Sequence, residues 1–203
     1  MGKKSVTNQD RARQVLAQEA ARIIVEQGVE DYRLAKIKAA ERLGLTDRGS
    51  LPGNREIEQA VAEYRMLFQG EDHENLLTTL RRVALSAMDF LSAYSPRLVG
   101  PVLAGTAGEH SVVNLHLFAD SAEQVAFELH RAGIEYRPFE RRYKSRRGQS
   151  DCFSAFAFVH DDFDIEATVF PYDGIRQAPM SPVDGRPMRR ADKSKVEALL
   201  VAS

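Results

Sequence analysis

The strongest fold signal in this chain lies in residues 99–120, VGPVLAGTAGEHSVVNLHLFAD. The segment begins with an apolar run, turns at Gly105 and Thr106, and crosses a short polar loop. A second run, residues 112–118, then alternates apolar and polar side chains, which is typical of a half-buried strand. This order predicts a strand, a turn and a second strand over residues 98–104 and 112–118.

The rest of the chain divides into two parts with different hydrophobic periods. The first 95 residues have the 3.6-residue period of helices, and the period changes to that of strands just after Pro96. We therefore expect an α+β protein, with an all-helical N-terminal region over residues 1–95 and a mixed sheet with flanking helices, a loop and a closing helix over residues 96–203. The remaining strands are expected over residues 134–143, 153–159 and 163–170, and a helix over residues 121–132.

Turn and capping residues predict where the helices begin and end. Gly28 is expected to end the first helix, and Asp31 to cap a second helix that ends at Gly44. Asn54 is expected to cap a third helix. A fourth helix is expected over residues 73–94, and Asp192 is expected to cap the closing helix.

Composition places the chain among ordinary globular proteins. It has 203 residues, of which 43% are hydrophobic and 28% charged, and its formal net charge is −1. No run approaches the ~20 apolar residues of a membrane span, and the first residues lack the apolar stretch of a secretory signal. We expect a cytoplasmic protein without a membrane partner. The single cysteine, Cys152, adjoins Phe153 in an apolar run and is expected to be buried.

Positive charge is concentrated in one segment of the second half. Six basic residues lie within this segment, and Glu140 is the only acidic residue among them. A basic cluster of this kind favours contact with the phosphates of RNA or DNA. The alternative is a solvated edge strand, where basic residues prevent sheets from aggregating. The basic segment consists of Arg137, Arg141, Arg142, Lys144, Arg146 and Arg147.

The order of elements around residues 99–120 resembles the nucleotidyltransferase superfamily, the DNA polymerase beta-like fold. In that family a Gly-Ser turn precedes a strand that carries an Asp-x-Asp pair. Ser111-Val-Val-Asn-Leu115 is similar to the family's Ser-Asp-x-Asp-Leu, but Val112 and Asn114 stand where the two aspartates are expected. The whole chain resembles bacterial nucleotidyltransferase-like proteins that join a helical region to this core.

The resemblance implies a site for two divalent cations, Mg²⁺ or Mn²⁺, in any active member. Valine cannot bind a metal, and the amide of Asn114 offers an oxygen without charge. Asp164 or Glu166, on one face of the expected strand 163–170, matches the family's third carboxylate and is the candidate catalytic residue. His116, on the same face of its strand as Asn114, could join them in a transition-metal cluster. The alternative is a polar sheet surface without a ligand.

Gly105 and Thr106 match the family's phosphate-binding turn. A glycine at the end of a strand lets backbone amides approach a phosphate, and the threonine hydroxyl adds a donor. The resemblance therefore implies that Gly105, Thr106, Asn114 and His116 contact a nucleotide.

Three functions are compatible with these patterns. The first is a nucleotidyltransferase-fold protein with a degenerate catalytic site that binds a nucleotide or RNA. The second is an active metal-dependent nucleotidyltransferase. The third is a protein-interaction module that uses the N-terminal helices. The sequence leaves the identity of any nucleotide, acceptor or cofactor open.

Overall fold

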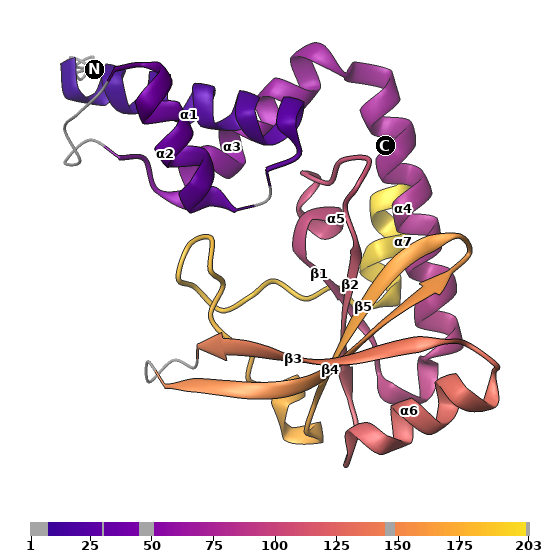
Figure 1. Ribbon diagram of the computed structural model, residues 1–203. Helices are drawn as coiled ribbons and strands as arrows, with labels where there is room; N and C mark the ends of the chain where they lie inside the picture. Colours follow the sequence, from indigo (N-terminus) through magenta and orange to yellow (C-terminus); the bar gives the residue numbers. More distant parts are fainter. Residues whose placement is uncertain (1–7, 30, 45–50, 145–148, 202–203) are drawn as a thin grey trace, which may run out of the picture. The chain divides into compact units, whose positions relative to one another are not determined.

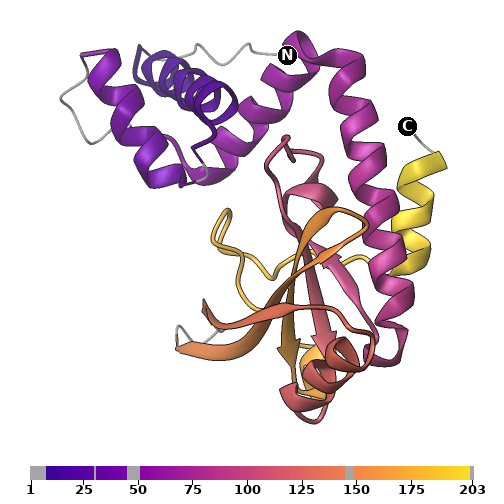
Figure 2. The ribbon, with the colours of Figure 1, turned by 45° about the vertical axis from the view of Figure 1, so that its right-hand side comes forward.

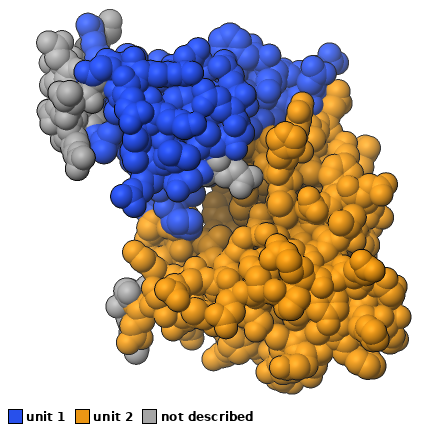
Figure 3. Space-filling model, viewed as in Figure 1, with its two compact units in different colours: residues 1–73, 182–184 blue, residues 74–181, 185–203 orange. Residues whose placement is uncertain are grey.

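The computed structural model describes residues 8–29, 31–44, 51–144 and 149–201. It has the expected α+β architecture, in which N-terminal helices precede a five-stranded mixed sheet. The chain divides into two compact units, shown in different colours in Figure 3. The first comprises residues 1–73 and 182–184, and the second residues 74–181 and 185–203. The sequence placed a domain boundary at residues 95 and 96, where helix gives way to strand.

Three helices build the first unit: α1 (Asn8–Gln27), α2 (Tyr32–Arg42) and α3 (Asn54–Phe68). Gly28 and Gly44 follow α1 and α2 with positive φ angles of 64°, as expected of residues that end helices. Asp31 caps α2, because its Oδ1 accepts hydrogen bonds from the backbone N–H groups of Arg33 and Leu34. The prediction that Asn54 caps α3 is wrong. Gly53 is the N-cap, and the backbone N–H of Gly53 donates to Glu56 Oε2 at 2.6 Å.

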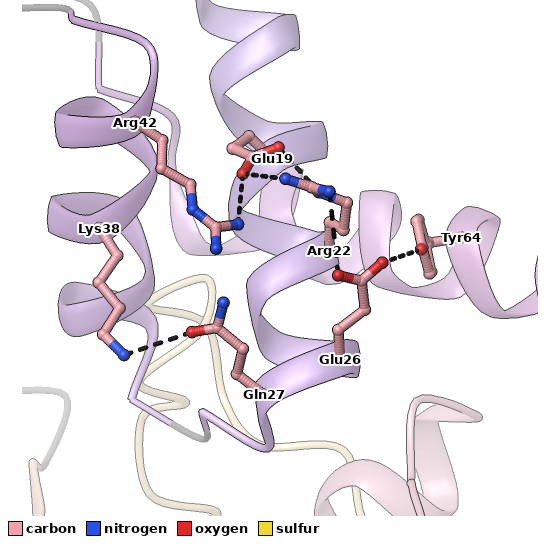
Figure 4. A network of polar contacts seen from close by, with 7 residues as sticks. All are labelled: Glu19, Arg22, Glu26, Gln27, Lys38, Arg42 and Tyr64. Carbon is pink, nitrogen blue, oxygen red and sulfur yellow. Dashed lines mark hydrogen bonds and ion pairs between the residues drawn. The ribbon is translucent and has the colours of Figure 1, made fainter.

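Small side chains allow the helices of the first unit to pack closely. The fully buried positions include Ala20 of α1 and Ala35 and Ala39 of α2. A network of polar contacts also joins the three helices (Figure 4). In it, Glu19 of α1 pairs with Arg42 of α2 at 3.1 Å, and it lies next to an Arg22–Glu26 pair that reaches Tyr64 of α3. Arg22, which is 2.8 Å from Glu19, is the main cause of a lowered pKa of the Glu19 carboxyl.

The second unit contains the sheet and its flanking helices. The long helix α4 (Gly70–Phe90) and the 3-10 turn η2 (Ser92–Tyr94) lead into it. The remaining elements are β1 (Arg97–Val99), α5 (Gly100–Ala104), β2 (Val113–Phe118), α6 (Ala122–Arg131), β3 (Tyr136–Lys144), β4 (Ser150–His160), β5 (Phe163–Phe170), η3 (Tyr172–Ile175) and α7 (Lys193–Val201).

The five strands form one sheet in the order β1-β2-β5-β4-β3 (Figure 1). Strands β2 and β5 pair in parallel, and the other neighbours pair antiparallel. The turn between β4 and β5 uses Asp161 and Asp162 at positive φ, which is typical of a tight hairpin. At the β1 edge, Leu98 exchanges two backbone hydrogen bonds with Ala191, so the returning chain covers this edge.

One face of the sheet carries the hydrophobic core of the second unit. Val113, Leu115 and Leu117 of β2 are fully buried, as the alternation predicted. They pack with apolar residues of α4, α6 and α7, and both ribbon views place α4 and α7 side by side (Figures 1 and 2). We call this the helix face. Among the described residues, no helix is both long and apolar enough to cross a membrane.

Two local predictions need correction. The strand expected over residues 98–104 stops at Val99, and α5 begins at Gly100. The reason is Pro101, whose fixed φ and missing N–H suit the first turn of a helix. Cys152 is exposed rather than buried. It pairs in register with Arg142 on the β3–β4 hairpin, on the same side of β4 as the core residues Phe156 and Phe158.

Candidate functional site

The sheet face opposite the helix face carries most of the polar side chains that the sequence singled out. We call it the polar face. Side chains alternate between the faces, so each strand contributes every second residue to it. The members used below are Arg97 of β1, Asn114 and His116 of β2, Arg141 and Tyr143 of β3, and Glu166 and Thr168 of β5.

Asn114 and Glu166 are direct neighbours on this face. The parallel register of β2 and β5 pairs the two residues. Between their side chains lies the guanidinium of Arg141, which donates to Asn114 Oδ1 at 2.8 Å and forms an ion pair with Glu166. The Asn114 amide is oriented by its own bond from Nδ2 to the carbonyl of Val112 at 3.0 Å. A cation of the protein itself therefore lies at the position where the family resemblance implies metal ions.

His116 is fully buried in a second polar network beside this one. Arg190 Nε donates to His116 Nδ1 at 3.0 Å. The ring proton must then be on Nε2, which lies 3.2 Å from the Tyr143 hydroxyl oxygen. Tyr143 in turn lies 3.4 Å from Thr168 Oγ1. Both ring nitrogens are thus occupied, and the register places Thr168, not a carboxylate, beside His116.

Burial and neighbouring cations keep His116 neutral. Desolvation lowers the pKa of the imidazole well below 6.5, and the positive charges of Arg190 and Arg141 lower it further. Burial also lowers the pKa of Arg190, to about 10. Tyr143 raises this pKa, and the positive charge of Arg97 lowers it. Three guanidinium groups and one carboxylate thus surround Asn114 and His116.

The turn at Gly105 and Thr106 differs from the strand end that the sequence suggested. Gly105 ends α5 with a φ of 81°, and Thr106 N–H donates to the carbonyl of Pro101 at 3.0 Å. The glycine at the strand end is Gly100, where a Cβ would lie 3.5 Å from Asn114 Nδ2. The role of Gly105 and Thr106 in phosphate binding stays a prediction.

The four described residues of the basic segment do not form one surface. Arg141 and, in the same alternation, Arg137 belong to the polar face, whereas Arg142 and Lys144 alternate to the opposite side of β3. Arg146 and Arg147 lie outside the described residues.

No described set of three or more His, Cys, Asp and Glu side chains is arranged to hold a metal ion. Asp164 is exposed and pairs in register with Val159, so the two candidate catalytic carboxylates have different surroundings. Ser86 Oγ lies 2.9 Å from His160 Nε2. Asp161 approaches the same nitrogen at 3.7 Å instead of orienting the ring from Nδ1, so the three do not form a nucleophile relay.

Three residues of this site were missed in the sequence: Arg97, Tyr143 and Arg190. Arg97 immediately follows Pro96, and Arg190 lies in a segment without periodicity. The alternation of β3, which also contains Arg141, could have placed Tyr143 on the polar face. Nothing local in the sequence indicates that Arg190 contacts His116.

The buried His116 gives a testable pH dependence. Its folded-state pKa lies below the unfolded value near 6.5, so unfolding takes up a proton below that pH. His116 thus adds stability above pH 6.5, and this contribution is lost as the pH falls toward the folded-state pKa, by up to about 1.4 kcal/mol per pH unit. Urea unfolding at pH 7.5 and 5.5 should show a larger loss in the wild type than in His116→Gln. His110→Gln, at an exposed loop position, is the control, and equal losses in all three proteins would contradict this account.

Comparisons with protein-family models, curated proteins and solved structures gave no match to this chain.

Proposed function

We propose that this protein binds a nucleotide on the polar face and does not catalyse two-metal nucleotidyl transfer. The observation that carries the proposal is the position of Arg141, whose guanidinium bridges Asn114 and Glu166. Two adjacent divalent cations need fixed anionic oxygen ligands. Here one carboxylate is present and it already pairs with a cation, so positive charge comes from arginine side chains.

Guanidinium groups bind phosphate oxygens directly. They supply planar, permanently charged donors whose geometry matches phosphate. Arg97, Arg141 and Arg190 together provide more positive charge than Glu166 balances. This excess favours an anionic ligand over a neutral one.

A nucleotide fits the described residues better than a long RNA does. An extended polyanion needs a continuous basic track, but the basic segment divides between the two sides of β3. The proposal is therefore a nucleotide and not RNA. We also propose a cytoplasmic location and a relation to the nucleotidyltransferase superfamily, both of which were expected from the sequence.

The test is titration of the full chain with each of the four ribonucleoside triphosphates, in EDTA and in Mg²⁺. We expect binding that EDTA leaves intact and that Arg141→Ala weakens at least about tenfold, since a charge-assisted hydrogen bond is worth about 1.5–3 kcal/mol. Arg142→Ala is the matched control, because the neighbouring arginine lies on the other side of the same strand. It should change the affinity by less than about twofold.

The same preparations should transfer no labelled nucleotide above background with Mg²⁺ or Mn²⁺. Labelling abolished by Glu166→Ala or Asp164→Ala would instead support the active enzyme. Binding that requires Mg²⁺ and is insensitive to Arg141→Ala would contradict the proposal.

A further inference from the structure

Two arginines from distant parts of the chain meet at the covered edge of the sheet. Leu98 and Ala191 pair across this edge, with Leu98 N–H donating to Ala191 O at 2.8 Å and the reverse bond at 2.9 Å. Both side chains are buried on the helix face. Because side chains alternate, the adjacent residues Arg97 and Arg190 lie on the polar face, where Arg97 is in register with His116 and Arg190 donates to its Nδ1.

Neither arginine forms an ion pair with a described carboxylate. Arg97 donates to the carbonyl oxygens of Ser95 and Pro96, and Arg190 to those of Gly174 and Ile175 and to the neutral His116. The Nη2 atom of Arg190 is buried and meets no hydrogen-bond acceptor in the described part of the chain. Two acidic groups of the same unit have other partners. Glu166 pairs with Arg141, and Asp192 accepts from the backbone N–H of Lys195 at the start of α7.

Arg190 is nevertheless held in a fixed position. Its guanidinium lies over the rings of Phe118 and Phe170, at 5.0 and 4.9 Å from their centroids. Hydrogen bonds to His116 Nδ1 and to the carbonyl of Gly174 fix its rotation. A cation that is already ordered loses little entropy when it binds a ligand.

We infer that Arg97 and Arg190 form the binding site for the phosphate groups of the proposed nucleotide. Two neighbouring cations without an acidic partner attract a multiply charged anion more than a singly charged carboxylate. A phosphate oxygen would also give the unpaired Nη2 of Arg190 an acceptor, after a shift of the atoms that cover it. This inference rests on the proposed function only in taking the ligand to be a nucleotide. The site for the phosphates is argued from the two arginines themselves.

Pyrophosphate, ATP and adenosine are the probes, each titrated in EDTA against the full-length wild type, Arg97→Gln, Arg190→Gln and the double variant. We expect pyrophosphate and ATP to raise the thermal unfolding midpoint and adenosine to have no comparable effect. Each single variant should weaken pyrophosphate binding at least about tenfold, and the double variant should abolish it. Arg189→Gln, at the adjacent exposed position, is the matched control and should bind like the wild type.

A second measurement separates loss of the site from loss of the fold. The side-chain N–H resonance of Arg190 should shift on addition of pyrophosphate in the wild type and in Arg189→Gln. Circular dichroism and the unfolding midpoint without ligand show whether each variant is folded, and Arg190→Lys, which keeps the charge, should retain part of the affinity.

The possible outcomes distinguish this inference from the proposed function. If pyrophosphate binds through both arginines and ATP does not bind, the inference is supported and the proposed function is contradicted. ATP binding that is unaffected in the folded double variant overturns the inference and leaves the proposed function standing. Absence of binding by either probe overturns both.

Discussion

The double variant Asn114→Asp with Arg141→Ala is expected to bind a divalent cation much more tightly than the wild type does. Adjacent strands lie about 4.8 Å apart, and the register pairs residue 114 with Glu166. A carboxylate at position 114 would therefore lie beside the Glu166 carboxylate, and removal of Arg141 would free both groups. Two anionic oxygen donors at this spacing suit Mn²⁺ or Mg²⁺.

The measurement is a titration with Mn²⁺ followed by the electron paramagnetic resonance signal of the free ion. We expect an affinity at least about a hundredfold above the wild type, which corresponds to about 2.7 kcal/mol. Asn114→Asp alone should bind Mn²⁺ weakly, because Arg141 would then pair with both carboxylates. Asn114→Asp with Arg142→Ala is the charge-matched control. Equal Mn²⁺ affinity in the single and double variants would show that Arg141 does not block the position.

Local sequence signals predicted most of the elements of this fold. Alternation located β2 and β5, and Asp31 and Asp192 cap their helices as expected. The error at residues 100–104 has a physical cause. A short apolar run without alternation fits a strand and a buried helical turn equally well, and only Pro101 favours the helix.

The site was less predictable because it depends on pairing between distant segments. The sequence places Asn114 and Glu166 at the polar positions of two alternating strands, but only the parallel register makes them neighbours. The contact between Arg190 and His116 joins residues that are 74 positions apart. Periodicity reports which face a side chain occupies, and it contains no information about which strand lies alongside.

The largest loss of stability is expected from Leu115→Ala. Leu115 is fully buried at the centre of β2, in register with Leu98 and Ala167. Truncation removes apolar contacts and leaves a cavity between packed strands and helices, which costs about 2–5 kcal/mol of the free energy of unfolding. Urea unfolding with an unchanged slope would measure this loss.

Two controls and a binding measurement complete this test. Leu115→Met, which keeps the volume, should cost less than about 1.5 kcal/mol, and Val159→Ala, at a position 56% exposed, less than about 0.5 kcal/mol. Leu115 lies between Asn114 and His116, whose side chains point to the other face. A one-residue slip of β2 would exchange the two faces. Val113 and Leu117, which are also fully buried, still oppose such a slip in Leu115→Ala. The folded variant should therefore keep the pyrophosphate affinity of the wild type, because Leu115 does not face the ligand. A folded variant with weakened binding would show that the polar face also depends on the packing beneath it.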